Sequence, residues 1–168
     1  NVVNGGKEVV DVLLTDPTIK AVSFVGSTPV AEAVYSKATN EGKRCQALGG
    51  AKNHAIVMPD ADLPNVVKAL TGAAFGSSGE RCMAISVAVA VGHQTATDLV
   101  ANLKTEMSRL KVGGPQNTNN DFGPLISAEH KEKVINFIES AEAEGAKLVV
   151  DGRSPELSAE DRAKAINV

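Results

Sequence analysis

The 168-residue sequence contains 43% hydrophobic and 22% charged residues, which is ordinary for a soluble globular protein. A net charge of −3 gives no footprint for nucleic acid or an anionic membrane surface, and no apolar run is long enough to span a bilayer. Two cysteines without a CxxC pair, and only three histidines, argue against a metal site or a disulfide framework and favour a reducing cytosolic or mitochondrial compartment.

The chain opens at Asn1 without a signal peptide, and its first residues resemble the middle of a structured unit, so we expect a fragment of a longer protein. Apolar residues at helical spacing predict helices at 7–15, 30–39, 60–74, 95–111 and 127–144. Short apolar runs predict strands at 19–25, 43–48, 54–58, 84–91 and 147–150, and we expect 19–25 and 84–91 to be buried. This alternation predicts an α/β fold with mainly parallel strands.

The turn that follows the strand at 19–25 consists of Gly26, Ser27, Thr28 and Pro29. We expect Thr28 to cap the next helix, with Pro29 at its first position. Because first-turn N–H groups lack partners, this junction is a plausible phosphate or ribose site. A plain strand-to-helix turn is the alternative, and the residues alone leave both open.

Other polar residues stand where helices are expected to begin or end. Asp60 and Asp62 suit capping and dipole interactions at a helix start better than they suit a metal. Ser127 is expected to cap the next-to-last helix, and Gly145 to end it.

A turn rich in glycine and serine, residues 76–81, leads to the lone Cys82 and the strand at 84–91. Small residues can leave a thiol open to a ligand while the backbone stays rigid. The cationic Arg81 and converging glycine N–H groups favour the reactive thiolate. The alternative is that Cys82 is a small buried hydrophobe and that Arg81 forms an ion pair, for example with Glu80.

From residue 154 the composition becomes polar, and Ser158 is expected to cap a short helix at 159–166 in a poorly anchored tail. The histidines are His54, His93 and His130, and none has an evident triad partner in the sequence. We expect the last two at the surface.

Several segments together resemble the aldehyde dehydrogenase family in order and spacing. They are Phe24-Val25-Gly26-Ser27, Leu48-Gly49-Gly50-Ala51-Lys52, Met58-Pro59-Asp60-Ala61-Asp62, Gly79-Glu80-Arg81-Cys82 and Phe122-Gly123-Pro124-Leu125. The resemblance implies an aldehyde dehydrogenase-like fold: the end of a Rossmann-type NAD-binding domain at 1–50, the first part of an α/β catalytic domain at 51–153, and a divergent tail at 154–168. It implies Cys82 as the nucleophile that forms a thioester, and Gly26, Ser27 and Gly49 as NAD contacts.

At one position the sequence differs from hydrolytic members of the family, and this indicates a subfamily. Hydrolytic members carry a water-activating glutamate at the position of Leu48 or, with a one-residue shift, Ala47, and neither side chain can act as a base. The chain is in this respect similar to coenzyme A-acylating methylmalonate-semialdehyde dehydrogenases. That similarity implies coenzyme A as cosubstrate, loss of carbon dioxide, and propionyl- or acetyl-CoA as product. Arg81 would then hold the carboxylate of the aldehyde substrate.

Two alternatives remain open at this stage: a hydrolytic aldehyde dehydrogenase whose base lies elsewhere, and an inactive truncated module for folding or interaction. The expected partner is a small aldehyde that bears a carboxylate, not a nucleic acid or a membrane. The resemblance also implies a homo-oligomer, in the bacterial cytoplasm or the mitochondrial matrix.

Overall fold

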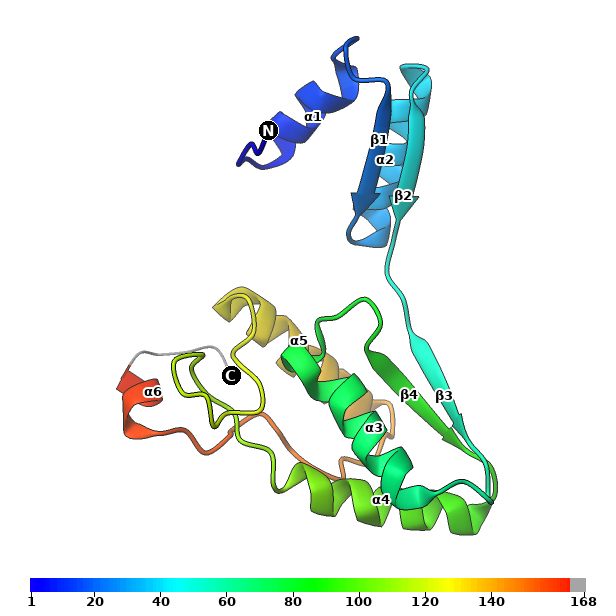
Figure 1. The fold of residues 1–168 in the computed structure, drawn as a ribbon, viewed down its shortest axis with the longest axis vertical. Coiled ribbons are helices and arrows are strands. Elements are labelled where there is room, and N and C mark those ends of the chain that lie inside the picture. Colours follow the sequence, from blue (N-terminus) through cyan, green and yellow to red (C-terminus); the bar gives the residue numbers. More distant parts are fainter. Residues whose placement is uncertain (164–168) are drawn as a thin grey trace. The chain divides into compact units, whose positions relative to one another are not determined.

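The computed structural model describes residues 1–163, which fall into two compact units, one of residues 1–51 and one that begins at Lys52 (Figure 1). Each unit contains one pair of parallel strands, as the alternating pattern predicted. No helix in the described part of the chain is long and apolar enough to cross a bilayer. The last residues of the helix predicted at 159–166 lie outside the described residues.

The first unit is built from α1 (Lys7–Thr15), β1 (Ala21–Val25), α2 (Thr28–Asn40) and β2 (Arg44–Leu48). Strand β1 pairs in parallel with β2, from Ala21 opposite Arg44 to Val25 opposite Leu48, and α2 forms the crossover between them (Figure 1). The core lies between the helices and one face of this sheet. Its members are Leu14, Val34 and Ala38, with Val10, Val22, Phe24 and Cys45 packed against them.

Lys43 ties this unit together from just before β2. Lys43 as a whole residue is only 7% exposed. Its Nζ donates to the backbone oxygens of Leu13 and Asp16 at the end of α1. The last carbonyls of a helix lack intrahelical partners and attract positive charge, so the ammonium group stabilises that helix end.

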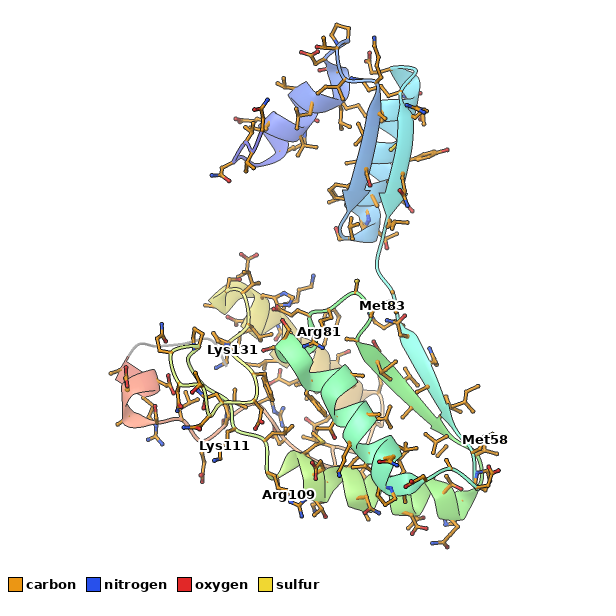
Figure 2. All side chains as sticks on the ribbon, in the orientation of Figure 1. Met58, Arg81, Met83, Arg109, Lys111 and Lys131 are labelled. Atoms are coloured by element: carbon orange, nitrogen blue, oxygen red, sulfur yellow. The ribbon has the colours of Figure 1, made fainter. Side chains whose placement is uncertain are left out.

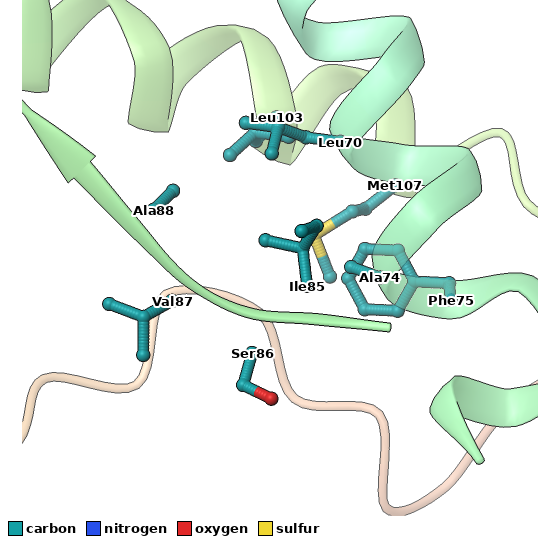
Figure 3. Close-up of a pocket in the computed structure, with 9 residues that line it drawn as sticks. All are labelled: Leu70, Ala74, Phe75, Ile85, Ser86, Val87, Ala88, Leu103 and Met107. Atoms are coloured by element: carbon teal, nitrogen blue, oxygen red, sulfur yellow. The ribbon is translucent and has the colours of Figure 1, made fainter. Parts of the chain in front are cut away.

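The second unit begins with β3 (Asn53–Val57) and α3 (Leu63–Phe75), and continues through the 3₁₀ turn η1 (Gly76–Gly79) into β4 (Ile85–Ala90). Three helices follow: α4 (His93–Met107), α5 (Ala128–Ala143) and α6 (Ala159–Ala163). Val57, Val67, Leu70 and Leu99 form the buried core between β3, α3 and α4. A small apolar cavity of about 130 Å³ remains between α3, β4 and α4, beside Leu70, Leu103 and Met107 (Figure 3).

Neither of the two strands expected to be buried is buried on both faces. In β1 the exposed side chains alternate with the half-buried ones that meet the helices, and Val25 is 65% exposed. In β4 the residues 86–89 are all exposed. In residues 1–163 each sheet has two strands and its core on one face, so a run of apolar residues does not by itself give burial on both faces.

Three local predictions were also wrong. Residues 147–150 form no strand, because no described strand pairs with them. Thr28 is not the cap of α2; Ser27 holds that position, and Thr28 Oγ1 accepts a hydrogen bond from Gly50 N–H at 3.1 Å. The described part of the tail, up to residue 163, is anchored: Asp161 is 6% exposed, and its carboxylate accepts from Gly114 N–H at 2.9 Å.

Three other predictions about helix ends were confirmed, but of the pair Asp60 and Asp62 only Asp62 is a cap, since Asp60 lies in the turn before α3. Asp62 caps α3, whose first residue is Leu63, by accepting from Asn65 N–H. Ser127 caps α5 by accepting from His130 N–H at 3.1 Å. Gly145 follows the end of α5 with φ of 97°, a conformation that glycine adopts without strain.

Candidate active site

The residues 76–81, here called the thiol turn, connect α3 to the segment that carries Cys82. Ser77, Ser78 and Gly79 adopt left-handed backbone conformations one after another, with φ of 54°, 55° and 74°. This reverses the chain within a few residues, and Glu80 N–H closes the turn by donating to the Ser77 oxygen at 3.0 Å. Serine rarely adopts a positive φ, so two such residues in sequence mark a constrained turn.

Two side chains fasten the thiol turn to the segment 122–130. Ser78 Oγ donates to the Gly123 oxygen at 2.5 Å. Glu80 Oε1 lies 3.3 Å from Nε2 of His130, in the first turn of α5. The structure therefore pairs Glu80 with His130, and the alternative of an Arg81–Glu80 ion pair is wrong.

The backbone on the other side of the thiol is held by β3. The Asn53 side-chain amide donates to the backbone oxygens of Cys82 and Ala84, each at 2.9 Å. The parallel pairing of β3 with β4 skips one residue at Ser86, which leaves a bulge next to these bonds. Bulges of this kind redirect the chain and are frequent beside functional sites.

Cys82 itself is exposed, while the backbone before and after it is hydrogen-bonded. Cys45, in contrast, is half-buried in the core of the first unit, where it acts as a small hydrophobe. The exposed thiol on a fixed backbone has the access that a nucleophile requires.

The Arg81 side chain turns back over Gly76 at the end of α3 (Figure 2). A Cβ on Gly76 would lie 2.8 Å from the guanidinium carbon, so only glycine allows this close approach. Within residues 1–163 no hydrogen bond or ion pair engages the guanidinium, and Arg81 is exposed. Its five N–H donors are therefore open to an anionic ligand.

Gly26, Ser27 and Gly49 come together in the first unit, where β1 and β2 end side by side. Gly26 N–H donates to the Leu48 oxygen at 3.1 Å, which links the two strand ends. A Cβ on Gly49 would lie 2.8 Å from Thr28 Oγ1, so this position has no room for a side chain. Ser27 is the N-cap of α2, and its hydroxyl makes no capping bond.

An apolar groove of about 640 Å³ lies between α1 and α2, beside the first turn of α2. Its lining includes Pro29 and Val30 from that turn and Leu14 from α1. At one side Asp11 receives hydrogen bonds from Lys37 and Lys7, which lower the pKa of its carboxyl group. The groove thus places an apolar slot next to a helix N-terminus.

The predicted site residues thus form two groups, one per unit: Gly26, Ser27 and Gly49 in the first, and Arg81 and Cys82 in the second. In the described part of the chain no cluster of histidine, cysteine, aspartate and glutamate gathers in a way that could hold a metal ion. Sequence reasoning gave no role to Asn53 and expected His130 only at the surface. No local pattern marks either residue, since their partners lie far away in the chain.

Comparisons with known proteins agree over almost the whole chain. The aldehyde dehydrogenase family model matches residues 1–166. A malonate-semialdehyde dehydrogenase of Pseudomonas aeruginosa is 58% identical over 158 residues, which cover 94% of this chain and 32% of that protein. A relative from Oceanobacillus iheyensis, named malonate-semialdehyde dehydrogenase 1, is 55% identical over 153 residues.

Solved structures give the same result. The methylmalonate-semialdehyde dehydrogenase of Oceanimonas doudoroffii matches with a TM-score of 0.91 and 64% identity, over 93% of this chain and 32% of that one. A Sinorhizobium meliloti 1021 protein described as a methylmalonate-semialdehyde dehydrogenase, solved in complex with NAD, matches with a TM-score of 0.92 and 52% identity, over 96% and 33%. The chain thus spans about a third of the length of its relatives. It has an aldehyde dehydrogenase-like α/β fold and belongs to the aldehyde dehydrogenase family.

Proposed function

We propose that this chain is the part of a coenzyme A-acylating semialdehyde dehydrogenase that carries the nucleophile and one side of the NAD site. The observation that supports this most is the exposed Cys82 thiol on a hydrogen-bonded backbone, directly after a guanidinium that has no partner among residues 1–163. Malonate semialdehyde and methylmalonate semialdehyde, named in the relatives, are aldehydes that also bear a carboxylate. Cys82 would act on the aldehyde group of such a molecule, and Arg81 would bind its carboxylate.

In the proposed reaction the Cys82 thiolate attacks the aldehyde carbon, and a C–S bond forms as the carbonyl π pair moves to oxygen. The Cys82 backbone N–H stabilises this oxyanion. When the oxyanion collapses and the C=O bond re-forms, the former aldehyde hydrogen leaves as hydride with the electron pair of the C–H bond, and a thioester remains on Cys82. The guanidinium of Arg81 holds the substrate carboxylate through paired hydrogen bonds.

The first unit provides features that fit a dinucleotide. Ser27, whose hydroxyl makes no capping bond, and the first-turn N–H groups of α2, which have no intrahelical partner, suit a phosphate or a ribose. The bare backbone of Gly26 and Gly49 allows close approach. The neighbouring groove between α1 and α2 suits an apolar ring. Bound NAD would accept the hydride.

Coenzyme A is proposed as the acyl acceptor because no carboxylate stands at the position that activates water in hydrolytic relatives. Ala47 and Leu48 occupy the end of β2, and neither can take a proton. A thiol is a stronger nucleophile than water and needs less help from a base. The thioester carbonyl can also accept the electron pair that is released when the substrate carboxylate leaves as carbon dioxide. The enolate then takes a proton from water, and the coenzyme A thiolate forms the new C–S bond as the Cys82 thiolate leaves.

A chimaera tests this proposal. The matching third of the Pseudomonas aeruginosa malonate-semialdehyde dehydrogenase is replaced with this chain, and NADH formation from malonate semialdehyde is measured with and without coenzyme A. We expect sustained turnover only with coenzyme A, and acetyl-CoA as the product. Equal turnover without coenzyme A would instead support the hydrolytic alternative. A folded chimaera with no turnover in either case would support an inactive module.

A further inference from the structure

The thiol turn is held in a conformation that its own residues do not favour. Ser77 and Ser78 both have positive φ, and neither is glycine. Left-handed serines persist in a fold only where surrounding contacts determine the backbone. The contacts that hold this turn therefore also affect the position of the residue that follows it, Cys82.

Two such contacts are made with the same segment, residues 122–130. Ser78 Oγ donates to the Gly123 oxygen at 2.5 Å, from a part-buried position. His130 Nε2 lies 3.3 Å from Glu80 Oε1, and both side chains are about one-third exposed, at 38% and 31%. His130 sits on a fixed support, since its own N–H is capped by Ser127 Oγ at 3.1 Å. The hydrogen bond of Ser78 holds the middle of the turn, and the contact between Glu80 and His130 lies at its end.

We propose that Ser78 and His130 are positioning residues for Cys82. They fasten the thiol turn to Gly123 and the first turn of α5, and so fix where the thiol lies when an aldehyde binds. Neither residue touches the reacting atoms; both act through the backbone of residues 78–81. The inference rests on the proposed role of Cys82 as the nucleophile.

Fastening and backbone strain can be separated by choice of variant. Ser78→Ala removes the bond to Gly123 and keeps the unfavourable φ. Ser78→Gly removes the same bond and relieves the strain. Ser77→Gly is the matched control, because it relieves strain next door while the Ser78 bond remains; its own hydroxyl makes no hydrogen bond in residues 1–163.

The histidine has its own pair of variants and its own control. His130→Ala removes the partner of Glu80, whereas His130→Gln keeps an N–H donor of similar reach. His93→Ala is the control, because His93 likewise stands in the first turn of a helix but is exposed. A positioning role predicts that glutamine rescues what alanine loses.

The first measurement uses the 168-residue chain and does not depend on catalysis. Hydrogen–deuterium exchange of the peptide that covers 76–83 is expected to be about tenfold faster in Ser78→Ala, Ser78→Gly and His130→Ala, and unchanged in the two controls. Exchange that matches the unsubstituted chain in all three variants would overturn the proposal.

The second measurement uses the chimaera described above, with rates normalised to the titrated Cys82 thiol. A misplaced nucleophile lowers kcat, so we expect about a tenfold loss or more in the Ser78 variants and His130→Ala, with KM for NAD unchanged and recovery in His130→Gln. If Cys82→Ala abolishes turnover while these variants keep it, the positioning role is wrong and the proposed function stands. If Cys82→Ala itself retains turnover, the proposed function is wrong.

Discussion

At the scale of single residues, the thiol of Cys82 is set apart from the other thiol of the chain by exposure. It is open to solvent, and the carbonyl of the same residue is held by Asn53. In the chimaera, Cys82→Ala is expected to lower kcat by a factor on the order of 10⁶, as when the nucleophile of another covalent enzyme is removed. NAD affinity should persist, since Gly26, Ser27 and Gly49 are untouched. Rapid-quench detection of the thioester and calorimetric titration with NAD measure the two effects, and the core variant Cys45→Ala is the control.

Arg81 allows a prediction about substrate choice. Its guanidinium has no partner in residues 1–163, so the Arg81→Leu substitution breaks no described ion pair. A charge-assisted hydrogen bond to a substrate carboxylate contributes about 1.5–3 kcal/mol, so kcat/KM for malonate semialdehyde should fall roughly 10- to 100-fold. Propanal, which lacks the carboxylate, should lose far less.

The matched control for this prediction is Arg109→Leu, which removes a surface arginine whose partner is Glu106 in the preceding turn (Figure 2). Arg109→Leu should leave kcat/KM unchanged for both malonate semialdehyde and propanal. Equal losses on malonate semialdehyde and propanal in Arg81→Leu would remove the recognition role and leave Arg81 with a structural one.

At the scale of elements, the junction of β1, α2 and β2 depends on a close approach. Thr28 Oγ1 accepts from Gly50 N–H, and the same oxygen leaves no space for a Cβ on Gly49, which would lie 2.8 Å away. Gly49→Ala should therefore destabilise the first unit by about 1–3 kcal/mol and weaken NAD binding. Gly50→Ala is the matched control, because its Cβ would lie at an ordinary 3.6 Å. Urea denaturation and NAD titration of the chain compare the two, and similar behaviour of both variants would contradict the assignment.

The elements that sequence predicted well are those whose signals are local. The helix of residues 7–15 was confirmed to the residue, and Asp62 and Ser127 were confirmed as caps, because periodicity and capping depend on neighbours within one or two turns. Residues 147–150 failed because a strand requires a partner, and apolar content cannot show whether one is present.

The site residues likewise separate into those with a local sequence signal and those that depend on tertiary contacts. The position of Cys82 on a small-residue turn was visible in the sequence, whereas the close approach of Thr28 to Gly49 was not. The bonds that fasten the turn were not visible either, since Ser78 meets Gly123 and Glu80 meets His130 only through the tertiary fold. The same is true of the two bonds from Asn53.

At the scale of the whole molecule, the described chain has two cores that share no residue. One surrounds Leu14, Val34 and Ala38, and the other surrounds Val57, Val67, Leu70 and Leu99. Leu14 and Leu99 are matched, because each is a leucine on a helix with 3% exposure. Leu→Ala at such a site costs about 2–5 kcal/mol, through lost transfer free energy and the cavity that remains.

Leu14→Ala should therefore speed amide exchange mainly in α1, α2 and their strands, and Leu99→Ala mainly in β3, β4, α3 and α4. Exchange of each peptide of the 168-residue chain, measured against urea, gives the local free energy of opening. The expected result is two separate sets of affected peptides, one for each core. If either substitution accelerated exchange equally in both sets, the chain would unfold as one cooperative body, and the proposed NAD contacts in the first unit would be energetically coupled to the thiol turn in the second.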